Sequence, residues 1–294
     1  MSRASRRQIL AAGAAIPLMA SAAKPRRAAD ECRGLLAGKT AVIYGAAGDM
    51  GSGISRAFAR EGAHVSLVGR TLESVERLAR EIASAGGNAE AARVDALERD
   101  SIERHLEALV ARRGRIDVSF NLINLGGPQG SPLTDMKRED FALPIETAMR
   151  THFLTGTAAG RHMARQKGGV ILALTAQVAR KPYTTSGGFG VACAAIEGLN
   201  RQLAIELGAY GVRVVTLRSS GSPDAAGVSA AIAEHARAAG VSLDEFKARI
   251  AEVTMLKRMP AVAEIAGAAV IMASDRASAV TAAVTNLTCG EIAD

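Results

Sequence analysis

The stretch Gly45-Ala-Ala-Gly48-Asp49-Met50-Gly51-Ser52-Gly53 follows the β-branched run Thr40-Ala-Val-Ile-Tyr44 and precedes a helical pattern with Ile54, Phe58 and Ala59 on one face. Glycine permits a tight turn out of a strand, and small residues let the N–H groups of a helix start approach a phosphate. In this strand–turn–helix context, the stretch predicts a loop that binds a dinucleotide diphosphate. The residues expected to line it are Gly45, Ala47, Asp49, Met50 and Gly51.

Short apolar runs and helical patterns alternate along the rest of the chain. Further strands are expected at 64–68 and near 90–94, 117–123, 169–175, 212–217 and 283–288, and helices at 71–85, 99–113, 139–167, 185–209 and 261–273. This order predicts one α/β domain over residues 30–294, a doubly wound seven-stranded parallel sheet with helices on both faces. The longest insertion, 218–258, holds helical patterns at 225–239 and 243–253 and is expected to form a helical flap over the ligand cleft.

Composition and charge exclude several classes of protein. The 294 residues are 48% hydrophobic and 22% charged, which excludes a disordered or fibrous chain. Three scattered cysteines, at 32, 193 and 289, argue against a disulfide framework or a metal site. Six of the seven net positive charges lie in residues 1–29, so residues 30–294 carry +1 and no basic surface for nucleic acid is expected.

The basic first segment has the features of an export signal. Ser5-Arg6-Arg7-Gln8-Ile9-Leu10 is followed by a mild apolar stretch and by Ala20-Ser21-Ala22, a small-x-small cleavage pattern. The paired arginines resemble a twin-arginine signal, which exports folded proteins, and the stretch is too short to span a membrane. We expect residues 1–29 to direct the protein to the periplasm. The alternatives are a disordered leader on a cytoplasmic protein and an organelle transit peptide.

Residues at the strand ends suggest which dinucleotide binds. Arg70 ends the second strand, 19 residues after Gly51, where NAD enzymes tend to carry an acidic residue. An arginine suits the 2′-phosphate of NADP, so NADP is favoured over NAD. Asp95, at the end of the third strand, is expected to face the adenine. The other expected cofactor contacts are Ala96, Asn121, Ile123, Thr175 and Ser219.

Five stretches of the chain resemble the short-chain dehydrogenase/reductase family, over residues 36–294. They are Leu36-Ala-Gly38-Lys39-Thr-Ala-Val, Phe58-Ala-Arg60-Glu-Gly-Ala-His-Val, Arg115-Ile-Asp117-Val-Ser-Phe-Asn121, Gly211-Val-Arg-Val and Ala273-Ser274-Asp275-Arg-Ala-Ser. The resemblance implies a single Rossmann-fold domain, NAD(P)-dependent oxidoreduction of a small molecule, and a homodimer or homotetramer formed through helices 139–167 and 185–209. The family's middle phosphate-loop glycine falls on Asp49, which we expect to cap its helix or face solvent.

The four residues that carry the family's chemistry are replaced. Its Asn, Ser, Tyr and Lys fall on Phe153, Ala176, Phe189 and Cys193. In the family the tyrosine protonates the substrate oxygen, the lysine lowers the tyrosine pKa, the serine binds the oxygen, and the asparagine supports a water chain. Ordinary ketone reduction by this mechanism should therefore be nearly abolished.

A few other side chains could act at the same place. Thr175 and His152 are the remaining catalytic candidates, and Arg180, Lys181 and Tyr183 could contact substrate. Arg218 stands in a segment that replaces the family's Pro-Gly, where a buried arginine would suggest an anionic or carbonyl-bearing ligand.

Two functions remain open from the sequence. The first is an NAD(P)-dependent oxidoreductase with non-standard machinery, acting on a small carbonyl, enone or imine. The alternative is a catalytically inactive dinucleotide-binding protein, serving as a sensor or a partner subunit.

Overall fold

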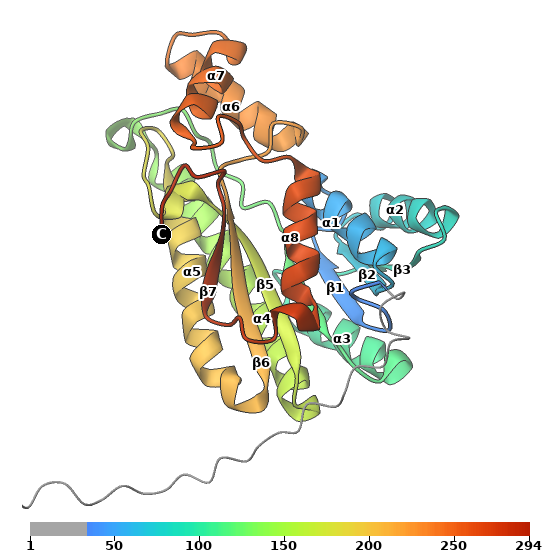
Figure 1. The fold of residues 1–294 in the computed structure, drawn as a ribbon. Coiled ribbons are helices and arrows are strands. Elements are labelled where there is room, and N and C mark those ends of the chain that lie inside the picture. Colours follow the sequence, from blue (N-terminus) through green and yellow to red (C-terminus); the bar gives the residue numbers. More distant parts are fainter. Residues whose placement is uncertain (1–33) are drawn as a thin grey trace, which may run out of the picture. The chain divides into compact units, whose positions relative to one another are not determined.

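The computed structural model describes residues 34–294, and these form an α/β domain built on one parallel sheet (Figure 1). The strand order is β3-β2-β1-β4-β5-β6-β7. The strands are β1 (Thr40–Tyr44), β2 (His64–Gly69), β3 (Asn88–Arg93), β4 (Val118–Asn121), β5 (Gly169–Ala176), β6 (Val212–Ser219) and β7 (Ala283–Leu287). The predicted doubly wound, seven-stranded sheet is confirmed.

Helices cover both faces of this sheet. One apolar cluster packs α1 (Asp49–Arg60), α2 (Leu72–Ser84) and α8 (Val262–Ala273) against the sheet. A second cluster packs α3 (Arg99–Arg113), α4 (Arg138–Gln166) and α5 (Gly188–Leu207) against the other face. Because the central strands are buried on both sides, they read as continuous apolar runs rather than as alternating patterns, and all five residues of β1 are buried.

The chain reverses its winding direction between β1 and β4. In β1, Ile43 lies opposite Leu67 of β2 on one side and opposite Phe120 of β4 on the other. The buried carboxylate of Asp117 helps to join these strands, since its Oδ2 accepts the Thr40 N–H at 2.8 Å. In open parallel sheets, ligands bind outside the carboxyl ends of the strands at such a reversal.

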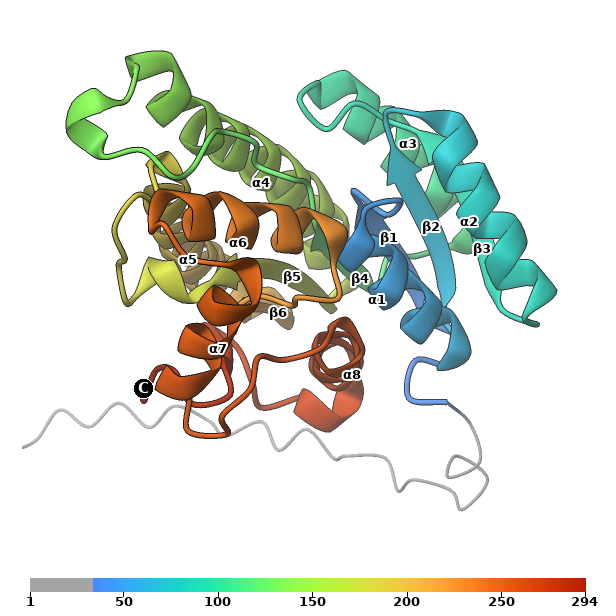
Figure 2. The same ribbon diagram turned by 90° about the horizontal axis from the view of Figure 1, so that it is seen from above.

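The two helices of the 218–258 insertion lie over that end of the sheet. They are α6 (Ala226–Ala238) and α7 (Leu243–Val253), and they match the two helical patterns expected there. Figure 2, seen from above, shows α6 crossing the sheet with one end beside α1. The flap is therefore placed next to the phosphate loop.

Two expectations concern the membrane and the leader. No helix within residues 34–294 is both long enough and apolar enough to cross a bilayer. The export signal predicted at 1–29 lies outside the described residues.

Candidate functional site

The loop between β1 and α1 has backbone geometry that demands glycine at two positions. Gly45 has φ +72°, and a Cβ there would lie 2.6 Å from the Leu122 carbonyl oxygen. A Cβ on Gly51 would overlap the Gly45 carbonyl oxygen. The loop therefore turns back tightly onto the first turn of the helix, with no side chain between them.

The start of α1 presents backbone N–H groups outward. The Ser52 N–H donates to the Gly48 oxygen at 2.7 Å and forms the first hydrogen bond of the helix turn. The N–H groups of Asp49, Met50 and Gly51 precede it, and N–H groups at this position have no acceptor inside their helix. Ala47 and Gly48 are exposed beside them. This cradle fits the diphosphate of a dinucleotide.

Asp49 caps a helix, but not the expected one. It is exposed and begins α1, and its Oδ2 accepts the N–H of Gly227 at 2.9 Å. Gly227 lies in the first turn of α6, so the carboxylate caps the flap helix. Asp49 is thus exposed, as one of the two expectations had it, but the other expectation is corrected, because the helix that it caps is α6 and not its own.

The residues expected at the adenosine end lie at neighbouring strand ends. Arg70 is exposed directly after β2, and Asp95 follows the adjacent strand β3. Asp95 is held in a turn, because its Oδ1 accepts the Leu97 N–H at 3.0 Å and its own N–H donates to Ser101 Oγ at 3.1 Å. Ala96 beside it is buried.

Asn121 is the last residue of β4, which pairs with β1, and Ile123 lies two residues beyond it. Asn121 is buried, its Oδ1 accepts the Ile123 N–H at 3.0 Å, and its Nδ2 donates to Thr155 Oγ1 at 3.2 Å. The Asn121 side chain therefore shapes the strand end, and any cofactor contact there comes from the backbone or from half-buried Ile123.

Three of the four family catalytic positions lie around the end of β5. Ala176 ends this strand, and half-buried Phe189 packs on an apolar cluster with Ala192 and Ile196. Cys193 is 1% exposed, and burial raises the pKa of its thiol to about 12. Where the family has the hydroxyls of serine and tyrosine and the ammonium of lysine, this chain has the methyl group of Ala176, the phenyl ring of Phe189 and the protonated thiol of Cys193.

The fourth family position lies on α4 and is exposed. Phe153 is 48% exposed on α4, whereas the preceding residue, His152, is 6% exposed. Burial lowers the pKa of His152 to about 4, so the imidazole is neutral at pH 7. A neutral histidine with this pKa is a poor acid, and the structure does not support His152 as the proton carrier.

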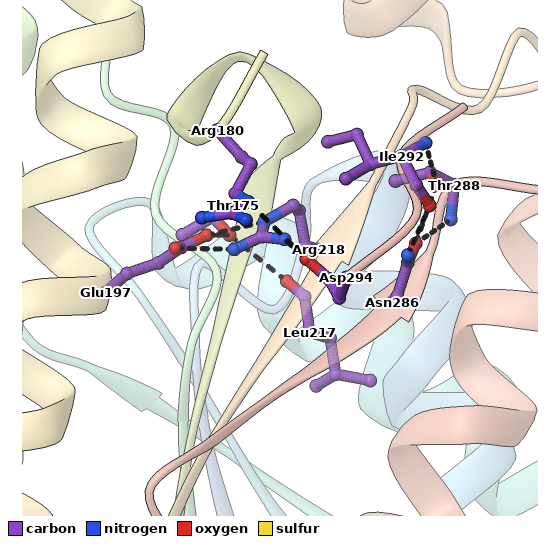
Figure 3. A network of polar contacts seen from close by, with 9 residues as sticks. All are labelled: Thr175, Arg180, Glu197, Leu217, Arg218, Asn286, Thr288, Ile292 and Asp294. Atoms are coloured by element: carbon purple, nitrogen blue, oxygen red, sulfur yellow. Dashed lines mark hydrogen bonds and ion pairs between the residues drawn. The ribbon is translucent and has the colours of Figure 1, made fainter. Parts of the chain in front are cut away.

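A buried ion pair lies beside Thr175, near the end of β5 (Figure 3). Arg218 of β6 makes a two-pronged contact with Glu197 of α5, with Nε–Oε1 and Nη2–Oε2 distances of 2.9 and 2.8 Å. Thr175 lies opposite Arg218 in the sheet, and its hydroxyl donates to the same Glu197 Oε1 at 3.0 Å. The Thr175 hydroxyl is thus engaged inside the protein.

The C-terminal segment completes this cluster. Asp294 Oδ1 accepts from Arg218 Nη1 at 2.9 Å and lies 3.8 Å from Arg180 Nε. The hydrogen bonds that Arg218 donates to the Glu197 carboxylate are the largest cause of the raised pKa of Arg218. Arg218 is buried as the ligand hypothesis required, but its charge is already balanced by two carboxylates. Its burial therefore does not indicate an anionic ligand.

Sequence reasoning missed Glu197 and Asp294. Glu197 lies four residues after Cys193, one helical turn along the same face of α5, and that spacing was the available signal.

Ser219, which was expected to contact the cofactor, is buried at the end of β6. Its Oγ accepts the Gly221 N–H at 3.2 Å.

Aromatic and polar side chains join the flap to the loops beneath it. His235 of α6 has Nε2 2.8 Å from Gln129 Oε1 and Nδ1 3.2 Å from Thr185 Oγ1. Tyr183 lies edge-on to the His235 ring at 5.2 Å and donates to Gln129 Oε1 at 3.4 Å. Burial raises the pKa of Tyr183 to about 12, so its phenol stays protonated.

The two basic residues expected near substrate both lie near carboxylates. Lys181 is exposed and its Nζ lies 3.5 Å from Glu291 Oε1, whereas Arg180 lies near Asp294 as described above.

Removing one partner of the buried pair should destabilise the fold. Glu197→Leu leaves the Arg218 guanidinium without its main partner, and we expect a loss of about 3–5 kcal/mol in the free energy of unfolding in urea. The double variant Glu197→Leu/Arg218→Met should recover most of this loss, because it removes both charges. Glu206→Leu, at an exposed position of the same helix, is the control. A Glu197→Leu protein as stable as that control would contradict this assignment.

The pKa of His152 predicts how stability depends on pH. Because the folded-state value of about 4 lies below the usual 6.5, the unfolded chain binds the proton first as the pH falls. The histidine therefore lowers stability as pH drops from 6.5 to 4, by roughly 3 kcal/mol in total. His152→Leu should lose less stability than the wild type over this range in urea unfolding. Parallel pH profiles for the two proteins would refute the assignment.

Comparison with known proteins places the chain in a family. A family model described as enoyl-(acyl carrier protein) reductase matches residues 45–290. L-rhamnose 1-dehydrogenase (NAD(P)(+)) of Azotobacter vinelandii is 31% identical over 255 residues, which cover 85% of this chain and 94% of that protein. An uncharacterized oxidoreductase of Bacillus subtilis is 30% identical over 192 residues, covering 61% and 69%.

Solved structures show the same fold. A short-chain type dehydrogenase/reductase from Mycobacterium ulcerans has a TM-score of 0.78 at 26% identity, covering 87% of this chain and 90% of its own. NAD+-bound xylitol dehydrogenase has a TM-score of 0.79 at 21% identity, covering 87% and 99%. The matched residues include the phosphate loop and the strand ends described above. The chain belongs to the short-chain dehydrogenase/reductase family and is an oxidoreductase of that type, whose fold implies a nicotinamide dinucleotide cofactor.

Proposed function

We propose that this protein is an NADP-preferring oxidoreductase that delivers hydride to a carbon that is already electrophilic, such as an iminium or a polarised enone. The observation that carries the proposal is the contrast between two parts of one site. The outward N–H groups of α1 and the exposed Arg70 suit a phosphorylated dinucleotide, whereas Ala176 and Phe189 cannot supply a proton.

The absence of the family's proton donor and oxyanion donor favours some classes of substrate over others. A general acid contributes about 10²–10⁴ in rate, and one oxyanion donor about 10²–10³. A ketone needs both, because its oxygen becomes an alkoxide as the carbon accepts hydride. An iminium nitrogen loses its charge in the same step and needs no proton. A bound reduced nicotinamide supplies the hydride, and the protein's part is to bind, orient and exclude water.

The names of the curated relatives point to other substrates. They include L-rhamnose 1-dehydrogenase and D-threitol dehydrogenase, which act on a sugar and a polyol by name. Because this chain lacks the hydroxyl, phenol and ammonium of the family site, we assign it a substrate that does not rely on them.

We further propose a homodimer or homotetramer assembled through α4 and α5. These helices carry the exposed apolar side chains Phe153, Val191 and Ile205, which are 48%, 48% and 76% exposed. A hollow between these two helices is lined by Leu203 and Leu207.

We also propose a periplasmic location, which the twin-arginine pattern of residues 5–10 supports. Signals of this kind export proteins that are already folded, so the protein could bind its cofactor before export.

Turnover of NADPH with matched substrates tests the proposed chemistry. We expect a cyclic iminium or an activated enone to be reduced and the corresponding unactivated ketone to be left unchanged, measured as loss of NADPH absorbance. The variant Ala176→Ser/Phe189→Tyr/Cys193→Lys should gain ketone reduction, provided that circular dichroism shows it folded. Binding of NADPH without turnover of any substrate class would instead support a non-catalytic binding protein.

Replacing Arg70 tests the preference for NADP. Arg70→Asp removes the positive charge proposed to meet the 2′-phosphate and should weaken NADPH binding by about tenfold relative to NADH in calorimetric titrations. Arg201→Asp makes the same charge change at an exposed position of α5 and should leave the ratio of the two affinities unchanged. An equal effect of Arg70→Asp on both dinucleotides would show that Arg70 does not recognise the phosphate.

A further inference from the structure

One carboxylate joins the phosphate loop to the flap, across 178 residues of sequence. Asp49 Oδ2 accepts the Gly227 N–H at 2.9 Å. Gly227 is the second residue of α6, so its N–H has no acceptor within its own helix. Asp49 is therefore the partner that the structure gives to this N–H group.

The same carboxylate lies at the positive ends of two helices. Asp49 is the acidic residue in the first turn of α1, and its side chain reaches the first turn of α6. A helix start carries about half a positive charge, which favours a nearby anion. The place between α1 and α6 therefore already holds one negative charge belonging to the protein.

A dinucleotide diphosphate needs the same place. The outward N–H groups of residues 49–51 form the cradle for it, and Asp49 belongs to that cradle. Two anions within a few ångströms repel each other even in water, by about 1 kcal/mol at 4 Å. The Asp49 carboxylate and the diphosphate thus compete for the positive electrostatic potential at the N-termini of α1 and α6.

We propose that the Asp49 carboxylate competes with the cofactor diphosphate, so that dinucleotide binding and the contact between Asp49 and the start of α6 oppose each other. This inference rests on the proposed dinucleotide binding. By thermodynamic reciprocity, if the contact between Asp49 and Gly227 weakens binding, then binding weakens the contact by the same factor. The cofactor then loosens the flap at the start of α6.

The response is confined to one end of the flap. Before α6, Asp224 accepts the Val262 N–H at 3.1 Å and so fixes the entry to the flap on α8. Near the end of α6, His235 is held by Gln129 and Thr185. Loosening at Gly227 therefore moves the short segment between these anchors and leaves the rest of the flap closed.

Two variants separate the charge from the hydrogen bond. Asp49→Asn keeps an oxygen that can accept the Gly227 N–H but removes the charge, whereas Asp49→Gly removes both and gives the family's glycine. Asp100→Asn, which removes an exposed carboxylate from the first turn of α3, is the matched control. Calorimetry with NADPH and NADH measures affinity, and hydrogen exchange of the segment around Gly227 measures the contact.

We expect both Asp49 variants to bind NADPH and NADH about fivefold more tightly than the wild type, because the diphosphate is common to both. The gain should shrink in 1 M salt, since the charges are exposed. Without nucleotide, exchange around Gly227 should be faster only in Asp49→Gly. Addition of NADPH should speed exchange there in the wild type and add nothing in Asp49→Gly.

Equal affinities in the wild type, both Asp49 variants and the control would overturn this inference and leave the proposed function intact. Unchanged exchange in Asp49→Gly would overturn it as well, because Asp49 would then not hold the flap. Failure of every variant to bind either dinucleotide would overturn the proposed function together with this inference.

Discussion

The guanidinium of Arg218 must be neutralised where it lies, buried at the carboxyl end of β6. An unpaired charge at such a place costs several kcal/mol, so the surrounding chain has to supply carboxylates. Glu197 supplies one from α5, and Asp294 supplies another from the C-terminal segment. Through this one side chain, the sheet, a long helix and the end of the chain are held together beside the catalytic region.

This arrangement engages the polar side chains that lie next to the family's catalytic positions. Thr175, the residue before Ala176 in β5, donates its hydroxyl to Glu197 and is used for structure. Phe189 and Cys193 extend the apolar packing of α5 into the places of a phenol and an ammonium. The phosphate loop follows β1, which β4 separates from β5 and β6, so the loop does not share a strand with this cluster.

Local patterns predicted most of the fold. The strand–turn–helix stretch at 40–60 and the periodicity of later segments predicted element bounds to within about three residues. A helix buried on one face shows apolar residues three or four apart, and a strand buried on both faces shows a short continuous apolar run, so both can be recognised within a few residues. The replacement of the family's four residues follows from the alignment of this sequence with the family's pattern, and it stays a prediction. The side chain directions at 152 and 153 could not be predicted, because a shift of one residue on a helix exchanges buried for exposed.

Contacts between distant segments could not be predicted in the same way. The Arg218 pair depends on the register of β5 against β6, which places Thr175 opposite Arg218, and on a C-terminal segment that folds back onto them. The Asp49 cap depends on where α6 crosses the sheet. Each of these contacts depends on how segments far apart in the sequence pack together, which the pattern around a single residue does not encode.

The central claim is that the dinucleotide cradle is intact although the proton donors are gone. Its most direct test is a titration of the wild-type protein with NADPH, followed by the emission of the reduced nicotinamide. We expect saturable binding with a blue shift and enhancement of that emission, as the ring leaves bulk water and lies beside half-buried Ala176 and Phe189. An emission spectrum that stays identical to that of free NADPH throughout the titration would contradict the claim.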